Sequence, residues 1–116
     1  MSIGEVVDRW TISYLKHFRA QIDTHLECWA CQEHCQNYDQ ETIKYYFNRL
    51  LKINGDIWNL ESDIRQGKEG ELGFEEVGRR ALQIRDFNGI RISLKNELNL
   101  QCNEGFQEIK INHASS

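Results

Sequence analysis

The chain has 116 residues, of which 40% are hydrophobic and 28% charged, and it contains no proline. This size and balance indicate one globular domain over residues 1–116 and exclude the disordered class. The net charge of −4 argues against a dedicated nucleic-acid binder, which needs a basic face. No run approaches the roughly 20 apolar residues of a membrane span, and the N-terminus lacks a signal-peptide pattern. We therefore expect a cytoplasmic protein whose four cysteines are reduced.

The first predicted helix begins at the N-terminus. Ser2 and Glu5 have the spacing of a capping box, in which each side chain bonds to the backbone N–H of the other residue. Apolar residues then recur mostly four positions apart, which predicts a helix over about residues 2–35. These residues are Ile3, Val7, Trp10, Tyr14, Phe18 and Ile22. Residues 36–39 read as a turn, and Asp39 is placed to cap the next helix.

The second predicted helix covers about residues 39–66 and carries the most regular apolar seam. Its apolar residues are spaced 4-3-4-3-4, a heptad pattern that indicates packing along a partner helix. They are Tyr46, Leu50, Ile53, Ile57, Leu60 and Ile64. Gly67 is expected to end this helix in the left-handed conformation, and a loop follows as far as Gly73.

The third predicted helix covers about residues 74–100, and residues 101–116 form a tail. Its buried side is predicted to contain Val77, Ala81, Ile84, Phe87, Leu94 and Leu98. The fold class is therefore all-α, with three long helices in an antiparallel bundle or coiled-coil-like hairpin. Because each helix has a wide apolar face, we expect a homo-oligomer.

Each predicted helix also carries a polar stripe directly beside its apolar seam. Residues three and four apart share a helix face, so the members of each stripe lie together. Charges next to a seam are costly unless they are paired or line something polar. The stripes are Glu5, Asp8 and Lys16; Asn54, Trp58, Glu61 and Arg65; and Asn88, Arg91, Lys95 and Asn99. Apart from Glu5, we predict that all these residues bind a ligand.

Tryptophan provides a stacking surface, arginine provides forked donors, and asparagine can bond to polar edges. Together they suit a nucleotide-like or sugar-phosphate ligand. Two simpler interpretations stay open. Glu61 and Arg65 can form an ordinary surface pair while Trp58 only packs. The third stripe can instead pair with carboxylates of the neighbouring helices in an interhelical network.

Two groups of residues have side chains of the types that bind metal ions. Glu5, Asp8 and Glu61 could converge on magnesium, as in a nucleotide pyrophosphohydrolase, although they form only part of the paired acidic pattern. A second cluster has the residue types of a zinc site. It consists of His25, Cys28, Cys31, His34 and Cys35. Its thiols lie on one arc of a helix rather than around a tetrahedron, which favours small buried thiols. We therefore predict no metal, no cofactor and no catalytic residue.

The three stripes fall within three ordered sequence blocks. The blocks are residues 3–12 followed by Lys16, residues 50–65, and Asn88 with Arg91, Lys95 and Asn99. In these blocks the chain resembles a family of short, uncharacterised all-helical proteins of bacteria and their phages. The resemblance covers most of the chain except about residues 25–38. It implies a helical fold and no established activity.

The leading hypothesis is a non-enzymatic, oligomeric binder of an anionic, nucleotide-like small molecule. If the chain is phage-encoded, one concrete form is a sponge that sequesters a host immune signal in the host cytoplasm. The alternatives are a structural or interaction module with an internal polar network, and the magnesium-dependent hydrolase. The expected partners are the chain itself and a small molecule, without extended nucleic acid or membrane. Whether the stripes meet within one subunit or across two is left open.

Overall fold

The computed structural model describes residues 1–64 and 69–103, except for the side chains of residues 69–72. This part of the chain is all helical, without strands, as predicted. It contains α1 (Ile3–Arg19), α2 (His25–Cys35), α3 (Gln40–Asp63) and α4 (Glu69–Gln101). None of these helices is both long enough and apolar enough to cross a membrane. The prediction of three helices is wrong, because the described residues form four.

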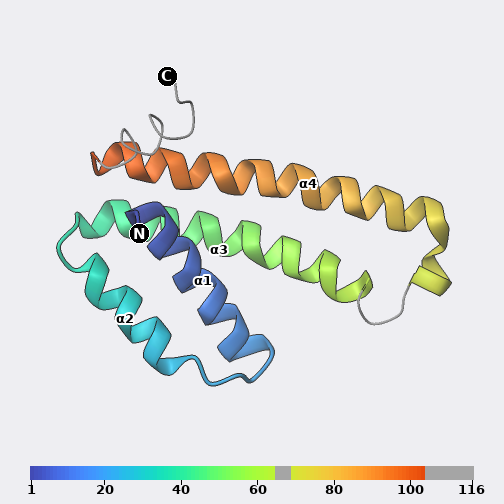
Figure 1. The fold of residues 1–116 in the computed structure, drawn as a ribbon, viewed down its shortest axis with the longest axis horizontal. Coiled ribbons are helices and arrows are strands. Elements are labelled where there is room, and N and C mark those ends of the chain that lie inside the picture. Colours follow the sequence, from blue (N-terminus) through green and yellow to red (C-terminus); the bar gives the residue numbers. More distant parts are fainter. Residues whose placement is uncertain (65–68, 104–116) are drawn as a thin grey trace.

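The predicted first helix over residues 2–35 is in fact two helices. α1 begins as expected, since the Ser2 hydroxyl accepts a hydrogen bond from the Glu5 N–H at 3.2 Å. It ends at Arg19, and α2 runs back beside it (Figure 1). The predicted seam fails beyond the first turns for the same reason: Phe18 is 62% exposed and Ile22 is 50% exposed.

A tight turn separates α1 from α2 without any proline or glycine. Gln21 adopts a left-handed conformation with φ of 58°, and the N–H of Ile22 donates to the carbonyl of Lys16 at 3.1 Å. The buried hydroxyl of Thr24 then donates to the carbonyl of Ser13 at 2.7 Å. This bond holds the start of α2 against α1, so the chain reverses instead of extending the helix.

α3 and α4 form a long antiparallel pair (Figure 1). The heptad seam of α3 faces α4. This confirms the prediction that the seam packs along a partner helix, and the partner belongs to the same chain. Tyr46, Leu50, Ile53 and Ile57 are buried, whereas Leu60 and Ile64 are half-buried. On α4, Leu94 and Leu98 are buried, Val77, Ile84 and Phe87 are half-buried, and Ala81 is exposed against expectation.

The ends of these helices agree with the predictions in part. The carboxylate of Asp39 caps α3 as expected, accepting from the N–H of Thr42 at 3.0 Å and from its hydroxyl at 2.7 Å. These hydrogen bonds lower the pKa of Asp39. The predicted loop before residue 74 is partly helical, and the helix is interrupted at Gly73, where φ is 81°. The predicted end at Gly67 and the tail beyond Asn103 lie outside the described residues.

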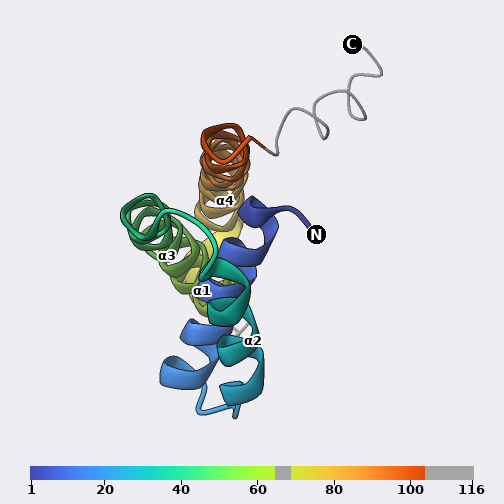
Figure 2. The same ribbon diagram turned by 90° about the vertical axis from the view of Figure 1, so that its left-hand side faces the viewer.

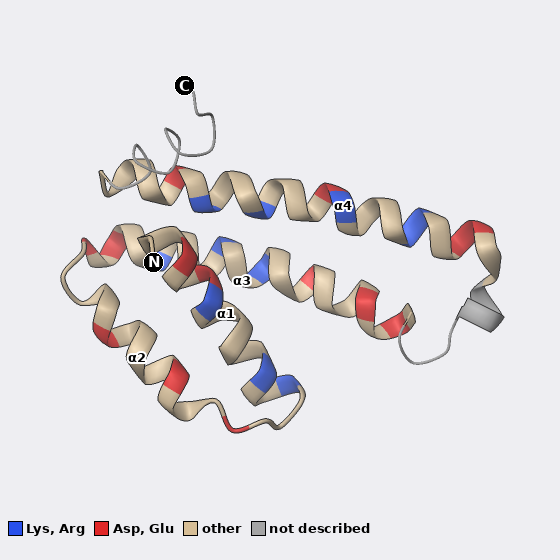
Figure 3. Cartoon of the chain, in the orientation of Figure 1, with Lys and Arg blue, Asp and Glu red and all other residues tan. Residues whose placement is uncertain are grey.

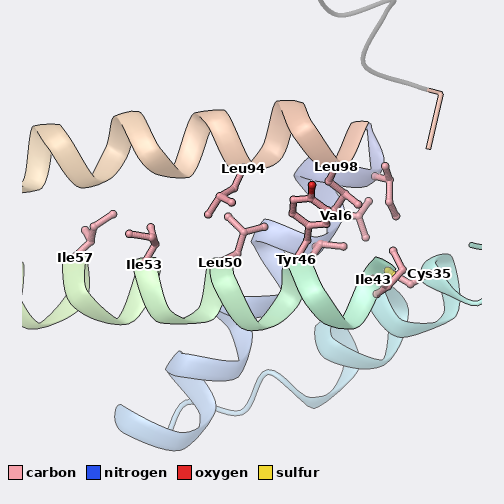
Figure 4. Packing of buried hydrophobic residues seen from close by; sticks show 11 residues of the cluster. Val6, Cys35, Ile43, Tyr46, Leu50, Ile53, Ile57, Leu94 and Leu98 are labelled. Atoms are coloured by element: carbon pink, nitrogen blue, oxygen red, sulfur yellow. The ribbon is translucent and has the colours of Figure 1, made fainter. Parts of the chain in front are cut away.

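α1 lies across the α3–α4 pair and contacts both helices, and α2 packs on α1 (Figure 2). The core forms where the start of α1 meets the first half of α3 and the end of α4 (Figure 4). Gly4 permits this approach, because a Cβ there would lie 2.5 Å from the carbonyl oxygen of Lys95. The close contact brings the polar stripes of α1 and α4 together.

Candidate functional site

The centre of the site is an ion pair between α1 and α4. Asp8 is completely buried, and Arg91 donates to it through Nε to Oδ1 at 2.9 Å and through Nη2 to Oδ2 at 2.7 Å. This forked geometry is the one in which arginine best compensates a buried carboxylate. Hydrogen bonding to Asp8 raises the pKa of Arg91 above its already high ordinary value. Arg91 is therefore a permanent cation held in a fixed orientation.

α3 joins this pair through a single amide. The Nδ2 group of Asn54 donates to Oδ1 of Asp8 at 2.9 Å and to the hydroxyl of Thr11 at 2.8 Å. The Thr11 hydroxyl donates in turn to the carbonyl of Asp8 at 2.7 Å. Asn54 and Thr11 are buried, so the network is shielded from water. The three predicted stripes therefore meet within one subunit.

Thr11 is a member of this network that the stripe pattern missed. It lies three residues after Asp8 and therefore on the same face of α1. That spacing was a usable signal, but threonine beside an apolar seam also suits ordinary packing.

Two other predicted site residues contact the protein rather than a cavity. Nζ of Lys95 lies 2.7 Å from a carboxylate oxygen of Glu5 and 4.0 Å from Oδ2 of Asp8. Oδ1 of the buried Asn99 accepts a hydrogen bond from the N–H of Gly4 at 2.7 Å. Figure 3 shows the matching arrangement of charge, with acidic segments at the start of α1 next to basic segments of α4. These two residues fasten α1 to α4.

A cavity of about 430 Å³ opens beside the network, between α1, α3 and α4. Aliphatic side chains form part of its wall, and most of the predicted site residues form the rest. The lining consists of Ile12, Leu15, Lys16, Ile22, Asn54, Ile57, Trp58, Glu61, Asn88 and Arg91. Nη1 of Arg91 also donates to Oδ1 of Asn88 at 3.4 Å. The cavity thus offers two cations, a carboxylate, two amides and an indole.

The remaining predictions are resolved only in part. Arg65 lies outside the described residues. In the described part of the chain, no group of three or more His, Cys, Asp or Glu side chains is arranged to hold a metal ion. Glu5 and Asp8, proposed for magnesium, instead engage Lys95 and Arg91.

The cysteines are free thiols. Cys35 is buried, as the interpretation of small buried thiols requires, whereas Cys28, Cys31 and Cys102 are half-buried. Burial raises the pKa of Cys35 to about 11, with smaller contributions from Cys31 and Cys102. A thiol with a raised pKa is a poor nucleophile and a poor metal ligand at neutral pH.

No protein-family model matches this chain, and no match was found among curated proteins or solved structures. The resemblance to a bacterial and phage family therefore stays a prediction.

Proposed function

We propose that the chain is a non-enzymatic binder of a small anionic molecule of the nucleotide-like or sugar-phosphate type. The observation that carries the proposal is the position of Arg91. One side of its guanidinium is bonded to the buried Asp8, and the same side chain lines the cavity, as Lys16 does. A guanidinium has five N–H donors in a rigid fork, so donors remain for a phosphate or carboxylate.

The other lining groups suit the rest of such a ligand. The indole of Trp58 can stack on a base or sugar ring, and the carboxylate of Glu61 can accept hydrogen bonds from hydroxyl or amino groups. Small-molecule sites usually enclose roughly 300–1,000 Å³, which includes the volume of this cavity. Because the network fixes Arg91 before binding, little of the binding free energy is lost in ordering it.

The proposal includes self-association and a cytoplasmic location. Large exposed apolar side chains on several helices favour an oligomer over a monomer. If the chain is phage-encoded, a binder of this kind would act in the host cytoplasm as a sponge for a nucleotide immune signal.

The decisive experiment is recovery of the ligand from purified protein by denaturation and mass spectrometry, followed by affinity measurements with the recovered compound. Nucleotides and sugar phosphates are also screened by thermal shift. We expect Lys16→Ala and Trp58→Ala to weaken binding at least tenfold, because a charge-assisted bond or stacked ring contributes that much. Lys44→Ala, which removes an exposed lysine of α3 outside the cavity, serves as the matched control.

The ligand should be released intact and without a need for magnesium. If it is converted to a product, the non-enzymatic assignment fails. If no compound is retained and no tested compound shifts the melting temperature, the binding proposal is rejected.

A second candidate function is supported by a separate observation. The bonds among Asp8, Thr11, Asn54 and Arg91 are internal to the fold, which favours a structural or interaction module. In that case Arg91→Ala lowers stability, whereas Lys16→Ala and Trp58→Ala change no binding because there is no ligand. The same variants therefore separate the two functions.

A further inference from the structure

α4 carries a second stripe on a face that packs against no other described helix. Residues spaced 4-4-3-4-3 share this face, which we call the outer stripe: Phe74, Gly78, Leu82, Arg85, Gly89 and Ile92. Its large apolar members are well exposed, with Phe74 at 97%, Leu82 at 52% and Ile92 at 55%. α4 contributes to the core through Leu94 and Leu98, which lie on another face of the helix.

The two glycines of the outer stripe have no role within the chain. A Cβ added at Gly78 or at Gly89 would meet no heavy atom within 4 Å. Glycine inside a helix is less stable than alanine, so the chain itself would fold better with alanine at both positions. Glycine at these positions is explained if a helix of another molecule packs there, because small residues let two helices approach closely.

We propose that a second copy of this chain docks on the outer stripe, with the two α4 helices antiparallel about a two-fold axis beside Arg85 and Asp86. In this register Leu82 lies over Gly89 of the partner subunit, and Ile92 lies over Gly78 of the partner subunit. Two-fold symmetry repeats both contacts with the roles exchanged. Leu82 and Ile92 therefore each meet a position where the other helix has no side chain.

Two charged residues, Arg85 on the stripe and Asp86 beside it, are compatible with this register. Arg85 and Asp86 are 72% and 69% exposed at the side chain, and both lie next to the proposed axis. The antiparallel arrangement gathers two Arg85 and two Asp86 side chains around the axis, so each arginine can reach the aspartate of the partner subunit. A parallel, in-register pair would place Leu82 and Ile92 over their own copies and leave both glycines uncovered, so these positions select the antiparallel form. An unrelated partner helix would not require this self-complementarity.

The interface leaves the cavity open, because α4 directs Asn88 and Arg91 to the cavity and Gly89 and Ile92 to the outer stripe. The outer stripe is thus the surface for the self-association proposed above. Dimer formation through it does not require a bound ligand.

Sedimentation velocity over a range of concentrations, with reductant present, tests the interface on the full chain. We expect a reversible dimer that Ile92→Gln weakens at least tenfold. Ile90→Gln is the matched control: Ile90 is 45% exposed but lies on another face of the same helix. Gly89→Gln should also weaken the dimer at least tenfold, although glutamine favours the helix and its Cβ would meet no atom of the same chain within 4 Å. Unchanged helical circular dichroism then excludes unfolding as the cause.

Charge exchange gives a sharper test. Arg85→Asp and Asp86→Arg each place like charges across the axis and should each weaken the dimer about tenfold. Mixing the two variants pairs two acidic groups with two basic groups, so a heterodimer should form with close to the original affinity. Nη2 of Arg85 and Oδ1 of Asp86 also lie 3.5 Å apart within one chain, but a purely internal role predicts no rescue on mixing.

A monomer at all concentrations, a dimer insensitive to Ile92→Gln, or absence of rescue on mixing would each overturn the interface. A chain that keeps its ligand but sediments as a monomer overturns the interface and the proposed self-association, but not ligand binding. A dimer that retains no ligand overturns only the binding proposal.

Discussion

The carboxylate of Asp8 and the guanidinium of Arg91, 83 positions apart in the sequence, are joined by two parallel hydrogen bonds of 2.9 and 2.7 Å. The Asp8 side chain is 1% exposed, whereas that of Arg91 is 28% exposed. The pair therefore has a buried half that belongs to the fold and an accessible half that borders the cavity. Replacing Arg91 alone changes both stability and the cavity, which is why Lys16 and Trp58 are better probes of binding.

Removal of the buried Asp8 carboxylate should destabilise the protein strongly. We expect Asp8→Ala to lower the free energy of unfolding by about 3–5 kcal/mol, because it leaves a guanidinium and an amide without their acceptor. Urea denaturation followed by circular dichroism measures the change. In the double variant Asp8→Ala/Arg91→Met, part of the loss should be recovered, since no uncompensated charge remains. A loss below about 1 kcal/mol for Asp8→Ala would contradict a buried pair.

Gly4 and Gly78 should respond oppositely to the same substitution. In Gly4→Ala the new Cβ would lie 2.5 Å from the backbone oxygen of Lys95, so α1 and α4 must separate. We expect a loss of about 1–3 kcal/mol in unfolding free energy, as for other overpacked contacts. Gly78→Ala has no neighbour within 4 Å and should gain about 0.5–1 kcal/mol from helix propensity when measured in dilute monomer. Equal effects on chemical denaturation would rule out the close approach at Gly4.

Cys35 should make the protein less stable in alkali. Its pKa is raised from 9.0 to about 11, mainly by burial. Between these values the unfolded chain has lost the thiol proton while the folded chain keeps it, so stability falls as pH rises. The contribution is fully present below pH 9 and amounts to about 3 kcal/mol across the window. Unfolding free energies from pH 8 to 11 measure it.

Cys35→Ala should reduce this pH dependence, and part of the decline that remains comes from Cys31, whose pKa is also raised by burial. The pKa of Tyr46 is also raised, by burial and by Glu97, so a smaller decline above pH 10 should persist in this variant. An identical slope in wild type and Cys35→Ala would show that the thiol is not buried.

The turn at Gln21 should accept glycine. Because Gln21 has φ of 58°, Gln21→Gly relieves the contact between Cβ and the backbone and should raise stability by up to about 1 kcal/mol. Gln32→Gly is the control, since Gln32 lies within α2 and should lose about 1 kcal/mol. Thermal unfolding distinguishes them by the sign of the shift. A decrease for both would mean that α1 and α2 are continuous, as the apolar spacing alone had predicted.

The site could be predicted from the sequence as far as helix faces determine it. The positions of Asp8, Asn54 and Arg91 beside apolar seams depend only on local spacing, and the structure brings these three residues together. Which residue bonds to which depends on how the helices cross. Spacing could not show that Lys95 and Asn99 would fasten α1 while Asn88 and Trp58 line the cavity.

The division between α1 and α2 could not be predicted, because no proline or glycine marks it and the apolar spacing continues through Ile22. The turn is maintained by a tertiary bond from Thr24 to the carbonyl of Ser13, which local sequence does not encode. The role of Gly4 was equally hidden. A glycine near the start of a helix has no distinctive pattern until another backbone is known to approach it.

The bond between Gly4 and Asn99 spans 95 positions, which has a consequence for biosynthesis. As the chain is made, α1 and α2 emerge first and can pair locally, but Asp8 lacks Arg91 and Gly4 lacks Asn99 until α4 is synthesised. Contacts that distant form late and slowly. A chain interrupted before α4 is left with a carboxylate that cannot be buried and with an exposed apolar seam on α3, the state on which proteases and chaperones act. Synthesis of α4 therefore completes the packing of α1.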